Sequence, residues 1–159
     1  MTKGWLSADL WIIGAGFIAA MHVGKLPPAV SALQIELSIS LVQAGLLLSL
    51  IQGAGMVSAL ALGSYVEKIG LKRCVLIGLL LLSVASAVGA FSHSMQALFI
   101  SRIVEGFGFL LVTLSAPAYI RQLVPIEQLH AKIGLWSSYM GTGVGLSLLL
   151  APFLIDSLG

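Results

Sequence analysis

The stretch that decides the fold is residues 41–91, LVQAGLLLSLIQGAGMVSALALGSYVEKIGLKRCVLIGLLLLSVASAVGAF. It contains two long runs without charge, joined by residues 67–73, which hold one acid and three bases. An apolar run of roughly 20 residues is long enough to cross the hydrocarbon core of a bilayer as a helix. We therefore expect a hairpin of two membrane-spanning helices, with a tight charged turn over 67–73 at the membrane surface.

The rest of the chain has the same apolar character. Of its 159 residues, 58% are hydrophobic and only 9% are charged. A soluble domain carries roughly 25% charged residues, so these charges are too few to cover a water-soluble globule. The net charge of +2 gives no basis for a nucleic-acid partner, and a single cysteine, Cys74, excludes an internal disulfide. The composition predicts an all-α, polytopic transmembrane helical bundle in a lipid bilayer.

Five segments meet or nearly meet the length of a membrane span, and we assign them to one transmembrane domain over residues 1–159. Pro27 and Pro28 should stop or kink the first span, before a short interfacial helix within 29–40 that ends at a serine cap for the next helix. We expect a polar loop over 124–132. The predicted spans are approximately 9–27, 41–65, 74–91, 95–122 and 133–155.

Basic residues gather on one side of this five-span arrangement. Short cytoplasmic loops carry an excess of lysine and arginine. We therefore expect an integral protein of the plasma (inner) membrane with a cytoplasmic N-terminus. The residues that fall on the predicted cytoplasmic side are Lys3, Lys68, Lys72, Arg73, Arg121 and Lys132.

The charged turn has a further pattern, a glycine, an acid, a second glycine and three bases at fixed spacing. This pattern resembles the loop signature between the second and third helices of the major facilitator superfamily of transporters. It departs from that signature at three positions: Glu67 replaces the usual Asp, Lys68 replaces the usual Arg, and Leu71 stands where a base is common. A plain cytoplasmic loop would explain the bases but not the glycines and the acid. The resemblance implies a cytoplasmic gate made of Gly63, Glu67, Lys68, Gly70, Lys72 and Arg73. In this gate we expect Gly63 to permit close contact between helices and Gly70 to permit a sharp turn.

The fourth predicted span holds two charges, Arg102 and Glu105, followed by Gly106. This resembles the fourth-helix motif of the same superfamily, in which the position of Glu105 is a glutamine. A spacing of three residues places both side chains on one helical face, where they can pair. Ionisable residues inside a span are costly and usually face a cavity or a partner, so we expect a substrate or coupling role. The alternative is that both lie shallow enough to reach the membrane interface.

Three shorter stretches resemble the cyanate/nitrate-like branch of the superfamily: residues 25–29 (KLPPA), residues 40–50 (SxxQAGxLxSL) and residues 134–136 (GLW). The resemblance implies small anions as substrates, which Lys25 and Arg102 could attract together. Lys25 could equally extend its ammonium group to the interface. His22 is a candidate proton carrier, or a histidine packed between helices with a hydrogen bond.

The sequence shows no pattern of an enzyme. There is no HExxH, no GxSxG and no pair of carboxylates, so we predict no catalytic residue, no metal site and no cofactor. The resemblance implies transport of a small solute by alternating access, with a proton or counter-ion as a candidate partner. The superfamily has twelve helices in two halves, so we expect a truncated form whose missing partner is the C-terminal helices. The alternative is a non-transporting helical membrane protein that acts as an interaction or assembly partner.

Overall fold

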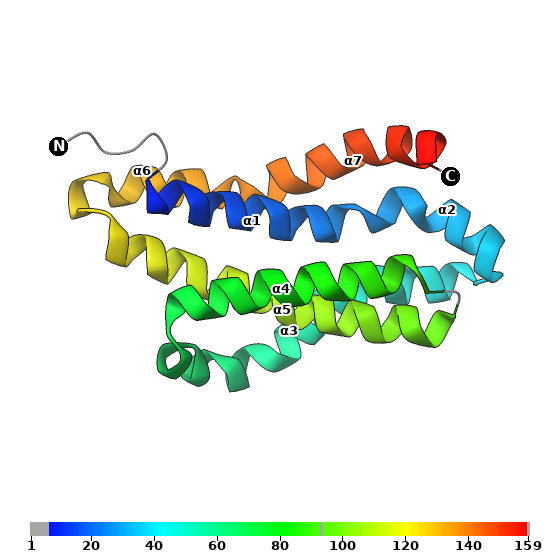
Figure 1. The fold of residues 1–159 in the computed structure, drawn as a ribbon, viewed down its shortest axis with the longest axis horizontal. Helices are drawn as coiled ribbons and strands as arrows, with labels where there is room; N and C mark the ends of the chain where they lie inside the picture. Colours follow the sequence, from blue (N-terminus) through cyan, green and yellow to red (C-terminus); the bar gives the residue numbers. More distant parts are fainter. Residues whose placement is uncertain (1–6, 93, 159) are drawn as a thin grey trace.

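The computed structural model describes residues 7–92 and 94–158, and Lys3 of the predicted cytoplasmic side lies outside them. The helices run along one long axis, with the start of α1 and the end of α7 at opposite ends of the bundle (Figure 1). Within the described residues there is no strand. The helices are α1 (Ala8–Gly24), α2 (Leu26–Leu37), α3 (Leu41–Ile69), α4 (Leu71–Ala90), α5 (Met95–Leu123), α6 (Ile126–Ser137) and α7 (Tyr139–Leu158).

The predicted transmembrane bundle is confirmed. Five helical stretches of the described residues are long and apolar enough to cross a membrane. Their outward faces carry large apolar side chains, such as Met56, Val57 and Phe153, each more than 70% exposed. Lipid is the solvent in which such a surface is stable. The stretches are Ala8–Ile35, Leu41–Ala59, Leu71–Ala90, Met95–Leu123 and Ile126–Leu154.

The first stretch combines α1 and α2, which are separated only by Lys25. We expected Pro27 and Pro28 to stop or kink the first span. The helix is indeed interrupted just before them, since α1 ends at Gly24, and both prolines stand in the first turn of α2. Proline is tolerated there because the first amide groups of a helix have no intrahelical acceptor. The break therefore places Lys25 between two helices that together form one candidate span.

Two predicted connections are shorter than expected. The charged turn over 67–73 is reduced to Gly70, because α3 continues to Ile69 and α4 begins at Leu71. Gly70 has a φ of +95°, which glycine adopts without steric cost. The predicted polar loop over 124–132 is wrong, since α6 begins at Ile126 directly after Pro125. Polar residues near a span end can remain helical because water satisfies their outer face.

The predicted serine cap of α3 is confirmed at Ser40. Its side-chain oxygen accepts a hydrogen bond from the backbone amide of Gln43, at 3.2 Å. The Gln43 side chain in turn accepts one from the Ser40 amide at 2.8 Å, which completes a capping box. Two amide groups that α3 would leave unpaired are satisfied in this way.

Helix α5 lies in the middle of the bundle and contacts α1, α3, α4 and α6. Glycines allow these close approaches. A Cβ atom built on Gly108 of α5 would lie 2.7 Å from the Gly78 carbonyl of α4, and one built on Gly106 would lie 2.6 Å from the Ile51 carbonyl of α3. On the other side of the bundle, Gly143 of α7 packs against the Phe17 carbonyl of α1 in the same manner. Small residues hold these helices together, as is typical in membranes.

This packing predicts that alanine destabilises the protein at Gly108 but not at Gly53. Gly108→Ala should lower the free energy of unfolding by about 1–3 kcal/mol, because the added methyl group has no room against the α4 backbone. Gly53→Ala is the matched control, since no described atom lies within 4 Å of its Cβ position. Unfolding in mixed detergent micelles, followed by circular dichroism, measures both. Equal stability of the two variants would contradict the close α4–α5 packing.

Candidate functional site

The carboxylate of Glu105 is the centre of the candidate site. It projects from the first half of α5, and its side chain has no exposed surface. Helix α5 is positioned by its contacts with α1, α3 and α4, so Glu105 lies inside the bundle rather than at a lipid-facing surface. A bare carboxylate at such a place is costly, and it requires cations or hydrogen-bond donors around it.

Two cations meet this carboxylate. Arg102, one turn earlier on α5, places Nη1 2.6 Å from Oε2 and Nη2 3.1 Å from Oε1 of Glu105. Lys25, from the break between α1 and α2, places Nζ 2.8 Å from Oε1. The predicted pairing on one helical face is therefore present, and Lys25 turns inward instead of reaching for the interface. Residues separated by 80 positions in the chain form one ion-pair cluster.

Two more side chains complete this cluster. The Lys25 ammonium donates a hydrogen bond to the Ser86 hydroxyl of α4, at 2.5 Å. It also lies 3.2 Å from Nδ1 of His22, which is itself 3.8 Å from Oε1 of Glu105. An ammonium group has no lone pair and can only donate, so Nδ1 of His22 accepts in this arrangement. We call Glu105, Arg102, Lys25, His22 and Ser86 the buried cluster.

The buried cluster carries more positive than negative charge. Arg102 and Lys25 oppose the single carboxylate of Glu105, and Arg102 is only 4% exposed. Within the described residues the Nε of Arg102 is buried and has no hydrogen-bond partner. An unpaired buried donor costs roughly 1–3 kcal/mol, and more for a charged group. The cluster therefore has an unused capacity to bind a hydrogen-bond acceptor.

Pockets lie on both sides of Lys25. One, of about 230 Å³, extends between α2, α4 and α5, and Lys25, Ser86 and Arg102 line it. The other, of about 270 Å³, lies between α1 and α7 and is lined by His22, Lys25 and Ser147 among apolar residues. Ser147 also donates a hydrogen bond from its hydroxyl to the Met21 carbonyl, at 3.0 Å. Lys25 thus separates two spaces large enough for a small molecule.

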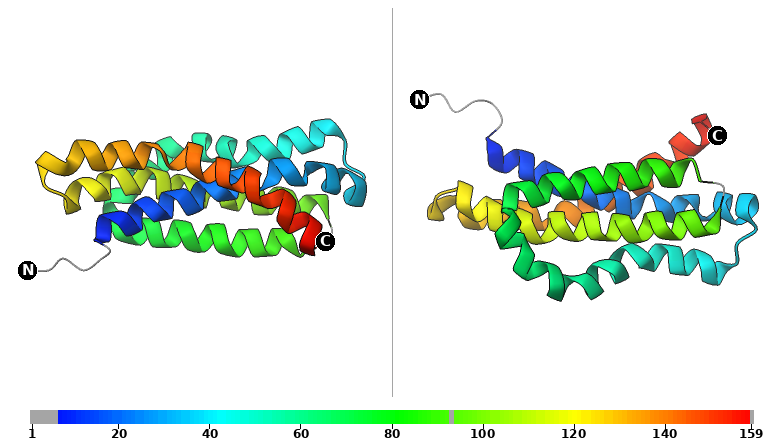
Figure 2. Two further views of the ribbon diagram at one scale, coloured as in Figure 1. Left: turned by 90° about the horizontal axis from the view of Figure 1, so that it is seen from above. Right: turned by 60° about the horizontal axis from the view of Figure 1, so that its bottom comes forward.

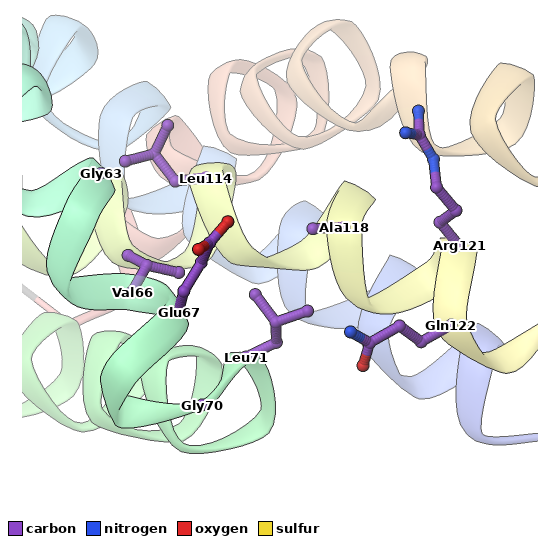
Figure 3. Close-up of a pocket in the computed structure, with 9 residues that line it drawn as sticks. All are labelled: Gly63, Val66, Glu67, Gly70, Leu71, Leu114, Ala118, Arg121 and Gln122. Atoms are coloured by element: carbon purple, nitrogen blue, oxygen red, sulfur yellow. The ribbon is translucent and has the colours of Figure 1, made fainter.

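The gate residues predicted from the loop signature lie elsewhere, at the end of the bundle where α3 turns into α4. Gly63, Glu67 and Gly70 line a pocket of about 650 Å³ between this turn and α5. Figure 3 shows the Glu67 carboxylate pointing from α3 toward α5, whereas Arg121 projects away from it. Within the described residues Glu67 has no ion-pair partner, and Lys68 lies 5.5 Å from the Tyr65 ring. Lys72 and Arg73 are exposed in the first turn of α4.

One reason given for the gate is wrong. Gly63 should allow a close approach between helices, but no described atom lies within 4 Å of its Cβ position. Gly63 lines the pocket between α3 and α5, so it contributes space rather than contact.

Sequence reasoning missed two parts of the interior. Ser86 has no sequence signal, because serine is common in apolar helices. Asp9 of α1 forms a buried ion pair with Lys132 of α6, with 2.6 Å between Oδ2 and Nζ. The position of this acid at the start of an apolar helix was the sequence feature that could have predicted the pair. Among the described residues no group of three His, Cys, Asp or Glu side chains could hold a metal ion.

Comparison with known proteins adds independent evidence. The sequence model of the Major Facilitator Superfamily matches residues 12–159. The chain is 30% identical over 151 residues to the "Putative niacin/nicotinamide transporter NiaP" of Bacillus subtilis, which covers 94% of this chain and 38% of that protein. It is 31% identical over 110 residues to the human "Proton myo-inositol cotransporter", which covers 69% of this chain and 17% of that protein.

A third relative, "Multidrug resistance protein 1" of Bacillus subtilis, is 24% identical over 127 residues, covering 80% of this chain and 33% of that protein. The chain thus spans well under half the length of the curated relatives it matches. No solved structure matches it. The five apolar spans are consistent with the family match over residues 12–159, and the chain belongs to the major facilitator superfamily.

Proposed function

We propose that this chain is the N-terminal part of a secondary transporter that moves a small solute across the membrane by alternating access. Membership of the superfamily supports transport in general, and the relatives are named for solutes as different as niacin, myo-inositol and drugs. In such transporters one half of the molecule moves against the other around a central site. We propose that the partner in this motion is a second set of helices that packs against the five candidate spans.

The substrate we propose is a small anion of the cyanate or nitrate kind. The observation that carries this proposal is the excess positive charge of the buried cluster. Arg102 has an unpaired Nε and lines a pocket of about 230 Å³ beside Lys25. A small anion in this pocket would accept hydrogen bonds from both cations while Glu105 keeps the net charge low. Charge-assisted hydrogen bonds of this kind are about twice as strong as neutral ones.

The same cluster suits coupling to a proton. His22 lies 3.8 Å from Glu105 and 3.2 Å from Lys25, and an imidazole ring can both accept and donate a proton. Once an anion draws Lys25 away from Glu105, a protonated His22 can take the place of the ammonium beside the carboxylate. We propose His22 and Glu105 as the proton-handling pair, and Lys25 and Arg102 as the substrate-binding pair.

Loss of one arginine tests the anion site. Arg102→Gln, made in the complete reading frame that contains these residues, should reduce uptake of labelled cyanate or nitrate roughly tenfold or more, since a charged hydrogen bond contributes about 1.5–3 kcal/mol. Arg121→Gln is the matched control, because Arg121 is exposed at the far end of the same helix. Unchanged uptake in Arg102→Gln, at equal expression, would remove Arg102 from the site. No uptake by the parent protein would favour the non-transporting alternative.

The loop signature supports a second proposal, that Gly63, Glu67, Lys68, Gly70, Lys72 and Arg73 form a cytoplasmic gate. Glu67 lines the large pocket without a cation partner among the described residues, so its charge is available to a neighbouring helix of the moving half. Such a contact would open and close with the transport cycle. Gly70 keeps the turn tight, because its positive φ fits no other residue well.

The gate proposal predicts a change in rate without a change in binding. Glu67→Gln should lower the initial rate of uptake several-fold, while the concentration of substrate at half-maximal rate stays the same. Glu127→Gln, which removes an exposed acid on α6, should change neither quantity. Initial rates over a range of substrate concentrations measure both. An equal loss of rate in both variants would show a general charge effect and contradict a specific gate.

We also propose that the end of the bundle with Lys68, Lys72, Arg73, Arg121 and Lys132 faces the cytoplasm of a plasma (inner) membrane. Cys74 has no exposed surface, so a new surface cysteine can be labelled selectively. Gln96→Cys, in the first turn of α5, should react with a membrane-impermeant maleimide on intact cells. Gln128→Cys, in α6 at the opposite end, should react only after permeabilisation. The reverse pattern would invert the proposed orientation.

A further inference from the structure

The ammonium group of Lys25 has three N–H donors, and the buried cluster uses all of them. Nζ lies 2.8 Å from Oε1 of Glu105, 2.5 Å from Oγ of Ser86 and 3.2 Å from Nδ1 of His22. In this arrangement Lys25 has no N–H group left for a bound anion. It must release one of its acceptors before it can donate to a new one.

The Ser86 hydroxyl is in the opposite situation. Its oxygen accepts the hydrogen bond from Lys25, so its own O–H hydrogen points away from the ammonium group. Among the described residues the contact with Lys25 is the one hydrogen bond that Ser86 makes. By contrast, Ser58 and Ser101 donate their hydroxyl hydrogens to a backbone carbonyl of the preceding turn. The hydrogen of Ser86 is therefore a donor without an acceptor, next to a cation.

Arg102 brings a second unused donor to the same place. Helices α1, α4 and α5 pack side by side (Figure 2). Gly89 follows Ser86 by three residues on α4, and a Cβ atom built on Gly89 would lie 3.8 Å from Nη2 of Arg102. Because residues three apart share one helical face, the guanidinium group lies against the face of α4 that carries Ser86. Within the described part of the chain, the Nε of Arg102 is buried and has no hydrogen-bond partner.

These groups are enclosed by the described helices themselves. Arg102 is only 4% exposed, and the side chain of Glu105 has no exposed surface. Helices that pack around this bundle in a longer chain would bury both groups further. The two unused donors meet in this interior, at the pocket of about 230 Å³ that Ser86, Gly89 and Arg102 line together.

The lining of this pocket determines which class of ligand fits. Its polar side chains are those of Lys25, Ser86 and Arg102, and among the described residues no acid and no amide side chain lines it. A neutral solute with hydroxyl groups would leave its own O–H donors unpaired, which is costly in a buried site. A cation would be repelled by the surplus positive charge. A small anion fits, because its outer atoms only accept hydrogen bonds.

We propose that Ser86 is a third binding residue for the anion, an inference that rests on the anion site proposed above. The anion accepts hydrogen bonds from the Ser86 hydroxyl and from Nε of Arg102 while Lys25 still pairs with Glu105. The ammonium group that donates to Ser86 makes its O–H a stronger donor, because hydrogen bonds in a chain polarise one another. Lys25 can then leave Glu105 for the anion and keep its contact with Ser86. Helix α4 thereby contributes to substrate binding together with Lys25 and α5.

Uptake kinetics of Ser86 variants test this role. Initial rates of uptake of labelled nitrate are measured over a range of concentrations, in the complete reading frame that contains these residues. Ser86→Ala should raise the concentration at half-maximal rate roughly tenfold, since it removes a hydrogen bond to a charged group. The maximal rate should stay within about twofold, as expected when only binding is weakened. Ser86→Thr keeps the hydroxyl group and should behave like the parent. Ser83→Ala is the matched control, because Ser83 is exposed one turn earlier on α4.

The direction of the change separates two roles of Ser86. If Ser86 only occupied one donor of Lys25, its removal would free an N–H group for the anion, and the half-maximal concentration would stay the same or fall. That result in Ser86→Ala, or an equal rise in Ser83→Ala, would overturn the proposal. An equal rise in Ser86→Thr and Ser86→Ala would also overturn it, because packing rather than the hydroxyl group would then matter.

The parent protein and Arg102→Gln separate this inference from the proposed function. Absence of nitrate uptake by the parent, with the protein present in the membrane, would contradict the anion site and the role of Ser86 with it. Uptake that Arg102→Gln lowers and Ser86→Ala leaves unchanged would keep the anion site and remove Ser86 from it. A smaller amount of a variant in the membrane lowers the maximal rate but not the half-maximal concentration, so poor accumulation does not imitate the expected result.

Discussion

A buried carboxylate in a membrane helix sets the constraint on which the rest of this structure depends. Glu105 has no exposed surface and lies in α5, the helix that contacts most of the others. It is stable there only because Arg102 and Lys25 meet it at 2.6 and 2.8 Å. Removing one partner of such a buried pair typically costs about 3–5 kcal/mol, so α1, α4 and α5 are held in one relative position.

This constraint explains features that look unrelated along the chain. Lys25 directly follows α1, and it meets Glu105 on the same face as His22, one turn earlier. Ser86 can bind the same ammonium only because α4 lies close to α5, and Gly78 and Gly108 permit that approach. The glycine contacts and the ion pairs therefore support each other, since either would be misplaced without the other.

Depth in the membrane gives the same residue type different roles. Lys25, inside the bundle, has its charge compensated by Glu105, and the surplus charge of the cluster faces small pockets. Lys72, at the surface end of α4, has no acidic partner among the described residues and adjoins an apolar groove instead. Relatives with very different named substrates share this family, so the chemistry must be argued from such local arrangements rather than from the fold.

The sequence by itself determined that the chain is a helical bundle with five apolar spans, that a serine near residue 40 caps α3, that the α3–α4 turn needs Gly70, and that Arg102 can pair with Glu105. Each of these follows from a local rule: apolar length, capping chemistry, the conformational freedom of glycine or the three-residue spacing on a helix. Only the tertiary structure decided that Lys25, His22 and Ser86 join the same cluster, that Gly63 lines a pocket instead of a helix contact, and that Asp9 pairs with Lys132. These features depend on which helices are neighbours and at what depth they cross, and no periodicity within one helix encodes the identity of its neighbour.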